Sequence, residues 1–411
     1  MSKAWAVFLL SSATFFLSQF YRSTNAVIAP QLIRDLSLDT QDLGLLSAAF
    51  FYAFGLAQIP ITIFLDRIGA RVMMTGFSLI GLSGALVFSW ADSLAMGIVG
   101  RALLGIGMAC NLMGTLKLLT LWFDPLRFAT LSGVILAIGT LGNMAATSPF
   151  VLLVDGIGWR SAIRVLAAVT FLLVMLFYAV VRDRPEEPAE NPSASRSPEA
   201  PPHWFEDLRL LFRNKDYWII SYGAFVRYGV FAAFQTLWAG PFLMEGLGFS
   251  PITAGNLIFL INIGLLLSGP LWGAVSDRIF KTRKWLVCGD LAALTLLLGL
   301  TACTDRHTGW TVLALLFLCF GIFQPGTLMY VQVKEVMPLR MAGTAMTGVN
   351  FFTMVGAAFF LQILGGLMQS LYPEASRSLP AFHTAFLVCA AFMASVSVLY
   401  ALTQDTRGQK G

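Results

Sequence analysis

Four cationic side chains lie inside long apolar runs of this sequence: Arg22, Arg101, Lys117 and Arg227. If these runs cross a membrane, each charge costs about 2.5–3.5 kcal/mol at mid-span on insertion scales, so a functional role is the default hypothesis. A guanidinium carries a planar fork of donors that fits a phosphate or a carboxylate with two hydrogen bonds. Arg22 and Arg227 therefore indicate a site for an anionic group.

The two arginines occupy equivalent places. Arg22 lies in the apolar segment 4–32 and Arg227 in the segment 216–244, which are the first segments of the two halves of the chain. An alternative for Arg22 is that it ends the first apolar run and extends to the membrane surface. The apolar residues AVIAPQLI that follow it favour the interior. We expect both arginines to face one central cavity from opposite halves.

The other two cations share one segment and cannot both face that cavity. Arg101 and Lys117 are sixteen residues apart, and at about 100° per residue they project roughly 160° apart. Arg101 is predicted to be structural. Lys117 lies close to the end of its segment, where it either extends to the membrane surface or acts as a gating or substrate-binding residue.

Neutral polar side chains can complete a binding site, although each is more often an interhelical hydrogen bond than a ligand contact. The candidates lie within about a turn of the two arginines on the helical wheel, or on other segments that reach the centre. They are Gln19 and Asn25 near Arg22, Gln235 and Trp238 near Arg227, and Tyr52, Asn111, Gln324 and Asn350 elsewhere.

Acidic residues are predicted to be absent from the middle of the segments. Only Asp155, Glu245, Asp290 and Glu335 touch them, each near an end. Proton-driven exporters of drugs or cations generally need a mid-segment acid, so that alternative is weakened. Two cations without an acid favour an anionic substrate. Proton coupling would then use the substrate, His383 or an end-lying acid.

The elements that must position these residues are membrane helices. Of the 411 residues, 57% are hydrophobic and 12% are charged, whereas soluble domains carry about 25% charged residues. This composition disfavours a soluble enzyme, a nucleic-acid binder and a secreted disulfide scaffold. Neither the five Cys nor the three His have metal-ligand spacing, and no reactive cluster is found, so we expect no enzyme activity, cofactor or metal.

Runs of about 20 apolar residues predict helical bilayer crossings. The expected fold is an all-α polytopic membrane protein with twelve transmembrane helices in two pseudo-symmetric six-helix bundles, 1–181 and 216–411. The Pro-, Ser- and Glu-rich stretch between them predicts a cytoplasmic linker, 182–215, with a possible surface helix starting near residue 203. The twelve predicted segments are 4–32, 43–65, 72–91, 95–121, 128–155, 161–181, 216–244, 252–276, 285–303, 309–333, 342–370 and 380–402.

The distribution of Lys and Arg predicts the orientation. Most of those outside the segments fall on loops that share a side with both termini, which places the termini in the cytoplasm. Short loops are typical of a bacterial inner-membrane protein. The expected partners are the lipid bilayer, a small anionic substrate and either protons or a counter-anion, with the protein acting as a monomer and without nucleic acid.

The halves repeat each other. LDRIGAR (65–71) follows the second segment, and SDRIFKTRK (276–284) follows the eighth. With these loops and Gly-Trp-Arg (158–160), the chain resembles the major facilitator superfamily over its whole length. The resemblance implies a conformational latch in which carboxylates and guanidinium groups pair in one state and separate in another. The latch residues it indicates are Asp66, Arg67, Arg71, Asp277 and Arg278.

Around the two arginines the resemblance narrows. VRYG at Arg227, and the TNAVIAPQL run after Arg22, are similar to the organophosphate:phosphate antiporters, which clasp phosphate with two such arginines. The segment through LAQIP is similar to the anion:cation symporters. The chain departs from the antiporters because 128–155 has no His and 43–65 has no Lys. These observations predict a secondary transporter of an organic anion, carboxylate or organophosphate, with a drug exporter and a non-transporting receptor or sensor as alternatives.

Overall fold

The computed structural model describes residues 3–184, 211–278, 283–324, 326–337 and 342–404. Within these ranges the regular structure is helical, as predicted. Nine of the described helices are long and apolar enough to cross a membrane, and one bent pair makes a tenth. Joining the shorter helices end to end gives the twelve predicted segments in two bundles of six.

The first bundle contains the helices that carry Arg22 and the other N-terminal candidates. Its first, fourth and fifth segments are each divided in two, whereas the others are continuous helices. The helices are α1 (Lys3–Ser23), α2 (Asn25–Leu36), α3 (Thr40–Ile68), α4 (Ala70–Ser89), α5 (Leu94–Met108), α6 (Asn111–Trp122), α7 (Pro125–Ala145), α8 (Ser148–Ile157) and α9 (Trp159–Val180).

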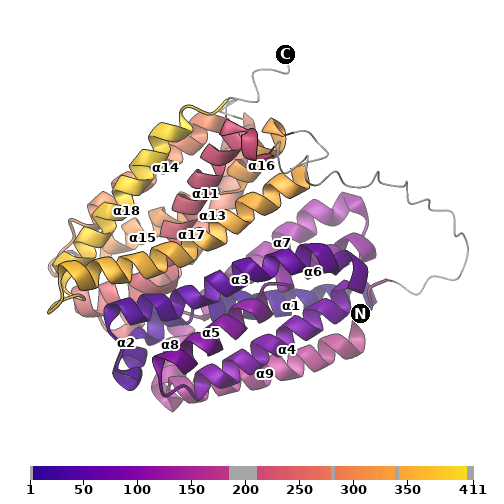
Figure 1. Cartoon of the computed structure of the whole chain (residues 1–411), viewed down its shortest axis with the longest axis horizontal. Coiled ribbons are helices and arrows are strands. Elements are labelled where there is room, and N and C mark those ends of the chain that lie inside the picture. The colour runs from indigo at the N-terminus through magenta and orange to yellow at the C-terminus, as the bar shows by residue number, and fades with distance from the viewer. Residues whose placement is uncertain (1–2, 185–210, 279–282, 325, 338–341, 405–411) are drawn as a thin grey trace, which may run out of the picture.

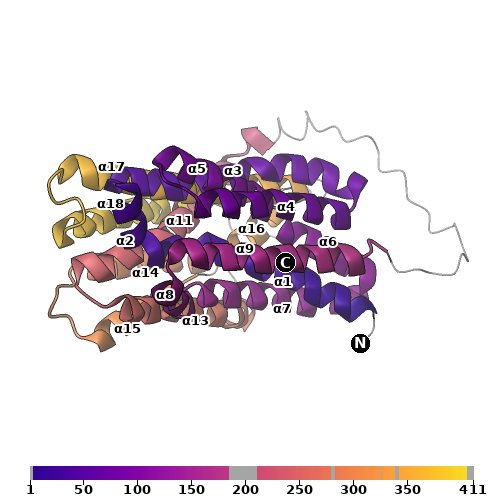
Figure 2. The ribbon, with the colours of Figure 1, turned by 90° about the horizontal axis from the view of Figure 1, so that it is seen from below.

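The second bundle repeats this order, with its first and fourth segments interrupted. The elements are α11 (Lys215–Ala233), the π-helix η1 (Phe234–Trp238), α12 (Ala239–Pro241), the π-helix η2 (Phe242–Gly246), α13 (Pro251–Arg278), α14 (Arg283–Thr301), α15 (Trp310–Ile322), α16 (Gly326–Val336), α17 (Ala342–Leu371) and α18 (Leu379–Tyr400). Figure 1 shows the two bundles side by side, and Figure 2, seen from below, shows the helices running along the long axis. The predicted surface helix lies mostly outside the described residues.

Two glycines at corresponding places show how closely the bundles match. A Cβ at Gly142 of α7 would collide with the Phe16 carbonyl oxygen of α1, and one at Gly356 of α17 would collide with that of Phe225 of α11. Without a side chain, each glycine lets two backbones approach closely. The fifth segment therefore packs on the first as the eleventh packs on the seventh.

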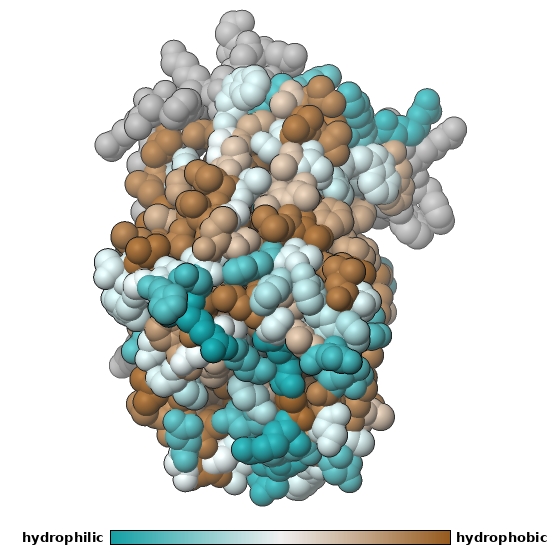
Figure 3. All heavy atoms as spheres, turned by 90° about the vertical axis from the view of Figure 1, so that its left-hand side faces the viewer, coloured by the Kyte–Doolittle hydropathy of each residue, from teal (hydrophilic) through white to brown (hydrophobic). Residues whose placement is uncertain are grey.

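The ends of the molecule differ. The start of α1 and the end of α18 lie at one end, here called the terminal end, and the loops after α2 and α17 lie at the other, here called the loop end (Figure 1). Viewed onto the loop end, hydrophilic residues gather across the middle and lower part of the face, with hydrophobic atoms around them (Figure 3). This distribution suits an end in water and sides in lipid.

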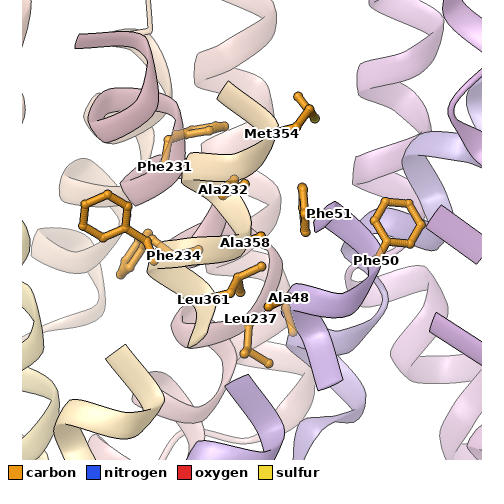
Figure 4. Close-up of a cluster of buried hydrophobic side chains, with 14 of the residues drawn as sticks. Ala48, Phe50, Phe51, Phe231, Ala232, Phe234, Leu237, Met354, Ala358 and Leu361 are labelled. Atoms are coloured by element: carbon orange, nitrogen blue, oxygen red, sulfur yellow. The ribbon is translucent and has the colours of Figure 1, made fainter. Parts of the chain in front are cut away.

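Contacts between the bundles are concentrated toward the loop end. Helices α3 and α17 pack against each other there, with Gly44 of α3 close to the Leu361 backbone of α17, and Figure 4 shows Ala48, Leu237 and Leu361 meeting in a shared hydrophobic cluster. The Ser148 hydroxyl donates to the Asn256 amide oxygen at 2.6 Å, also across the interface. The bundles are therefore closed against each other in this half of the molecule.

Breaks in the helices have identifiable causes. The chain turns at Thr24, where the Tyr21 carbonyl accepts hydrogen bonds from the Thr24 hydroxyl at 3.1 Å and from Arg101 at 3.0 Å. In the seventh segment, Pro241 has no N–H for the preceding turn. Two residues before it, the Ala239 N–H bonds to the Phe234 carbonyl in a π-helical pattern. Such π-helical turns are frequent at functional sites.

Candidate functional site

A cavity of about 790 Å³ lies between the two bundles. Asn143 and Gln235 line its inner part, while Thr130 and Gly269 line it nearer the terminal end. The closed contacts at the loop end lie beyond its inner part. The cavity thus reaches from the centre of the molecule toward the terminal end, as expected for a carrier open to one side.

Arg22 lies in the last turn of α1 and lines the cavity. Its Nη1 donates to the Tyr228 hydroxyl at 2.7 Å, across the bundle interface, and its guanidinium lies 5.1 Å from the centre of the Phe54 ring. The buried Nε has no hydrogen-bond partner, and among the described residues no carboxylate pairs with this arginine. Arg22 therefore places a positive charge on the cavity wall without a described carboxylate partner.

Arg227 also lines the cavity, but it is already paired. Its Nε donates to Asp290 Oδ2 at 2.9 Å, and the two side chains are 4% and 0% exposed. The prediction that acids lie only near segment ends was wrong for Asp290. It lies in the third turn of α14, where packing against α18 removes it from solvent. The central charge is thus two cations and one acid.

Four of the predicted neutral candidates line the same cavity as the two arginines. Gln235 donates to the Asn262 amide oxygen at 2.8 Å, while Asn350 accepts from the Tyr330 hydroxyl at 3.1 Å. Donors and acceptors therefore surround the two cations. The four candidates are Gln19, Gln235, Gln324 and Asn350.

The other five candidates do not line the cavity in this conformation. Tyr52 donates to Gln362 at 3.1 Å, Asn25 to Ser47 at 2.8 Å, and Lys117 to the Leu65 carbonyl at 2.7 Å. Asn111 donates to the Thr14 carbonyl at 3.3 Å, and the buried Trp238 packs beside the backbone of α3 and α17. In this conformation these side chains connect helices and do not face the cavity.

Arg101 is buried, with 1% of its surface exposed, and it does not line the cavity. Besides its bond to the Tyr21 carbonyl, its guanidinium lies 4.8 Å from the centre of the Phe50 ring. A cation at the end of a helix interacts favourably with the helix dipole. Arg101 therefore holds the end of α1 directly beside Arg22.

The predicted latch is described only in part, because the side chains of Asp66, Asp277 and Arg278 lie outside the described residues. Arg67 is exposed. The Arg71 side chain donates to the Tyr178 carbonyl at 2.8 Å, and the backbone N–H of Arg71 donates to the Asp183 carboxylate at 2.9 Å. Arg71 thus connects α4 to the end of α9 within one bundle.

Sequence reasoning missed several cavity residues. Tyr228 follows Arg227 directly but was not singled out, although its hydroxyl is the partner of Arg22. Gln58 and Asn143 also line the cavity, as does Tyr330. Gln58, Asn143 and Tyr330 could have been found by a search for polar residues on segments 2, 5 and 10, because each interrupts an apolar run.

Within the described ranges, no three or more His, Cys, Asp and Glu side chains form a group that could hold a metal ion. The arrangement can instead bind an anionic group by charge and hydrogen bonding.

Comparison with known proteins agrees with this geometry. A family model described as Major Facilitator Superfamily matches residues 11–361 and 223–411. A relative described as "Probable hexose phosphate transport protein" from Chlamydia muridarum is 25% identical, covering 89% of this chain and 86% of its own length. A "Probable sulfoacetate transporter" from Cupriavidus necator is 26% identical over 65% of this chain and 63% of its own.

Solved structures show the same fold. A bacterial homologue of the human lysosomal transporter Spinster, in an inward-facing and unoccupied conformation, matches with a TM-score of 0.78. The match covers 98% of this chain and 97% of that one at 18% identity.

Proposed function

This chain belongs to the Major Facilitator Superfamily, and on that premise we propose that it carries a small organic anion across the membrane by alternating access. The observation that carries the proposal is Arg22, a cation on the cavity whose described partners are a hydroxyl and aromatic rings rather than a carboxylate. In a site of low dielectric, such a charge attracts an anion far more strongly than a neutral or cationic solute.

The proposed substrate bears a phosphate, sulfonate or carboxylate group on a small polar body. Arg22 and Arg227 bind the anionic group, and Gln19, Gln235, Gln324 and Asn350 contact the remainder. The relatives named as hexose phosphate and sulfoacetate transporters support this chemistry. The sequence favoured an anion because no acid was expected near the two arginines, but Asp290 is buried beside Arg227. The proposal therefore depends on the charge of Arg22.

We further propose that both termini are cytoplasmic in a bacterial inner membrane, so that the cavity faces the cytoplasm in this conformation. Transport would require the contacts between α3 and α17 to open while the terminal ends of the bundles close. The Asp66–Arg71 and Asp277–Arg278 loops act as the latch for that closure. The working units are 1–181 and 216–411, joined by the linker 182–215, and one chain is sufficient.

Uptake into proteoliposomes tests the proposal. The purified chain is reconstituted, and accumulation of glucose 6-phosphate, glycerol 3-phosphate, sulfoacetate and glucuronate is compared with that of tetraphenylphosphonium, a cation. We expect at least one anion to accumulate above protein-free liposomes. We expect Arg22→Gln to lower that uptake at least about tenfold, because a charge-assisted hydrogen bond contributes about 1.5–3 kcal/mol.

Arg377→Gln is the matched control, because Arg377 pairs with Glu245 near the loop end and does not line the cavity. It should transport at the wild-type rate. Transport of the cation alone, or full anion uptake by Arg22→Gln, would contradict the proposal.

A further inference from the structure

The pair formed by Arg227 and Asp290 is buried yet incompletely bonded. Asp290 Oδ2 accepts from Arg227 Nε, but Asp290 Oδ1 and Arg227 Nη2 are both buried without a hydrogen-bond partner. Most buried polar atoms in proteins are paired, so unpaired ones call for an explanation. The pair is therefore built with one free acceptor and one free donor.

The two members of the pair have different access to the cavity. Arg227 lines it, whereas Asp290 lies behind Arg227 on α14 and does not. An anion that enters the cavity can thus contact Arg227 without contacting Asp290. If the anion draws the guanidinium toward itself, Asp290 loses its partner.

Arg227 is the cation that pairs with Asp290 in the part of the chain that the structure describes. The elements around Asp290 also carry Lys284 on α14, Lys215 and Asp216 at the start of α11, Glu335 on α16 and His383 on α18, and neither lysine forms an ion pair with Asp290 among the described residues. Tyr330 and Tyr400 are within electrostatic range of Arg227, and both hydroxyls are already donors, to Asn350 and Gln332. The thiols on these elements are Cys288 on α14, Cys319 on α15 and Cys389 on α18.

We propose that Asp290 is a proton-binding site that couples anion binding to proton uptake. This inference rests on the proposed function. In the empty cavity, ionised Asp290 neutralises Arg227. When an anion forms hydrogen bonds with Arg227, one proton from the water in the cavity binds the released carboxylate, because an unpaired buried charge is strongly disfavoured.

The charges balance in this exchange. One negative charge enters with the substrate and one positive charge enters with the proton, so binding a monoanion adds no net charge to the cavity. Since anion and proton favour each other's binding, the coupling is reciprocal. The affinity for the anion should therefore rise as pH falls, by at most about tenfold per pH unit for one proton. The same carrier would then move anion and proton in the same direction.

A measurement without substrate tests the proton site directly. Arg227→Gln removes the partner cation, as a bound anion does in the proposal. Infrared spectra at neutral pH should show the C=O stretch of a protonated carboxylic acid in Arg227→Gln, and that band should be missing from wild type and from Arg227→Gln/Asp290→Asn. An ionised carboxylate in Arg227→Gln would overturn the proposal, whether or not an anion has been found to bind.

A second measurement uses sulfoacetate, whose own charge is constant near neutral pH. A pH indicator in weak buffer reports protons taken up when sulfoacetate binds the purified chain. We expect about one proton for each bound anion in wild type and in Glu245→Gln, a matched acid that pairs with Arg377 outside the cavity. We expect none in Asp290→Asn.

The two experiments separate the two claims. Sulfoacetate binding without proton uptake, or with equal uptake in Asp290→Asn, would refute the coupling and leave the anion carrier intact. If no anion binds, the proposed function fails at that point, and the infrared comparison still decides whether Asp290 takes up a proton when Arg227 is lost.

Discussion

The two arginines on the cavity occupy equivalent segments of the repeat but have opposite surroundings. Arg22 bonds to a neutral hydroxyl of the other bundle and lies over the aromatic ring of Phe54. Arg227 pairs with a carboxylate of its own bundle, out of contact with solvent. An incoming anion thus meets available donors on one side and a competing carboxylate on the other.

Because of this difference, the two arginines should contribute differently to the affinity for the anion and to the stability of the fold. No described carboxylate pairs with Arg22, so loss of its charge should affect ligand binding far more than folding. The Arg227 charge is required by Asp290, so its loss should affect both. Equivalent segments of the repeat therefore carry the same residue type in two different physical roles.

The largest predicted effect is on stability. Arg227→Gln should lower the free energy of unfolding near neutral pH by at most about 3–5 kcal/mol, the cost of an unpaired buried charge, because the buried Asp290 loses its partner and must take up a proton to become neutral. Arg227→Gln/Asp290→Asn should recover most of that loss, since two neutral amides need no counter-charge. Thermal melting of the two purified variants checks this. Equal melting temperatures for both would refute the view that the pair is electrostatically linked.

Arg22→Gln should weaken anion binding about 10- to 100-fold while changing the free energy of unfolding by less than about 1 kcal/mol. The binding loss follows from one or more charge-assisted hydrogen bonds of about 1.5–3 kcal/mol each. Titration calorimetry with the transported anion measures the first value and melting the second. A large loss of stability without loss of affinity would reverse the comparison.

Tyr228→Phe removes the hydroxyl that accepts from Arg22 in the empty cavity. A neutral hydrogen bond contributes about 0.5–1.5 kcal/mol net, so the anion should bind about 2- to 10-fold more tightly once it no longer displaces this hydroxyl. The same calorimetric titration applies. Weaker binding would mean that the hydroxyl contacts the substrate.

The smallest effect concerns a partly exposed acid near the loop end, beyond the span 4–32. Asp35 accepts from Trp159 at 2.9 Å and from Arg160 at 2.7 Å, and these bonds with Arg34 hold the pKa of its carboxyl below the ordinary value. Asp35→Asn should cost about 1 kcal/mol or less near pH 7, as exposed ion pairs generally do.

The pH dependence of that loss has a definite sign. A carboxyl with a lowered pKa stabilises the folded state above its unfolded pKa of about 4 and loses this contribution as pH falls through the folded value. Melting curves of wild type and Asp35→Asn should therefore converge below about pH 4. A difference that grows on acidification would contradict the assignment.

Much of this molecule could be predicted from its sequence because the signals are long and periodic. Apolar runs of membrane-spanning length predicted the segments, and the repeated Asp-Arg loops predicted two similar bundles. Arg22 and Arg227 could be singled out because charges are rare in such runs.

The features that the sequence did not predict depend on which helix faces pack against each other. Asp290 is the sixth residue of the predicted segment 285–303, which suggested a place near an end, but it is the eighth of the 19 residues of α14, and the packing of α11 and α18 makes it the partner of Arg227. Trp238 would lie on the same side of the helix as Arg227 only if the segment were a regular α-helix. The π-helical turns around Pro241 change that register, and Trp238 packs toward α3 instead. Neither effect is visible in hydropathy or spacing.

A thermal-stability screen of the purified chain tests the central claim most directly. Wild type, Arg22→Ala and Arg227→Ala are melted with sugar phosphates, phosphonates, dicarboxylates, monocarboxylates and organic cations. A ligand at about 100 times its Kd stabilises the folded state by about 2.7 kcal/mol, which shifts melting visibly. We predict that one anion class stabilises wild type and that each variant is stabilised much less, by about 1.4 kcal/mol at most if its binding is tenfold weaker. Stabilisation by apolar cations alone, unchanged in both variants, would contradict the account and favour a drug exporter.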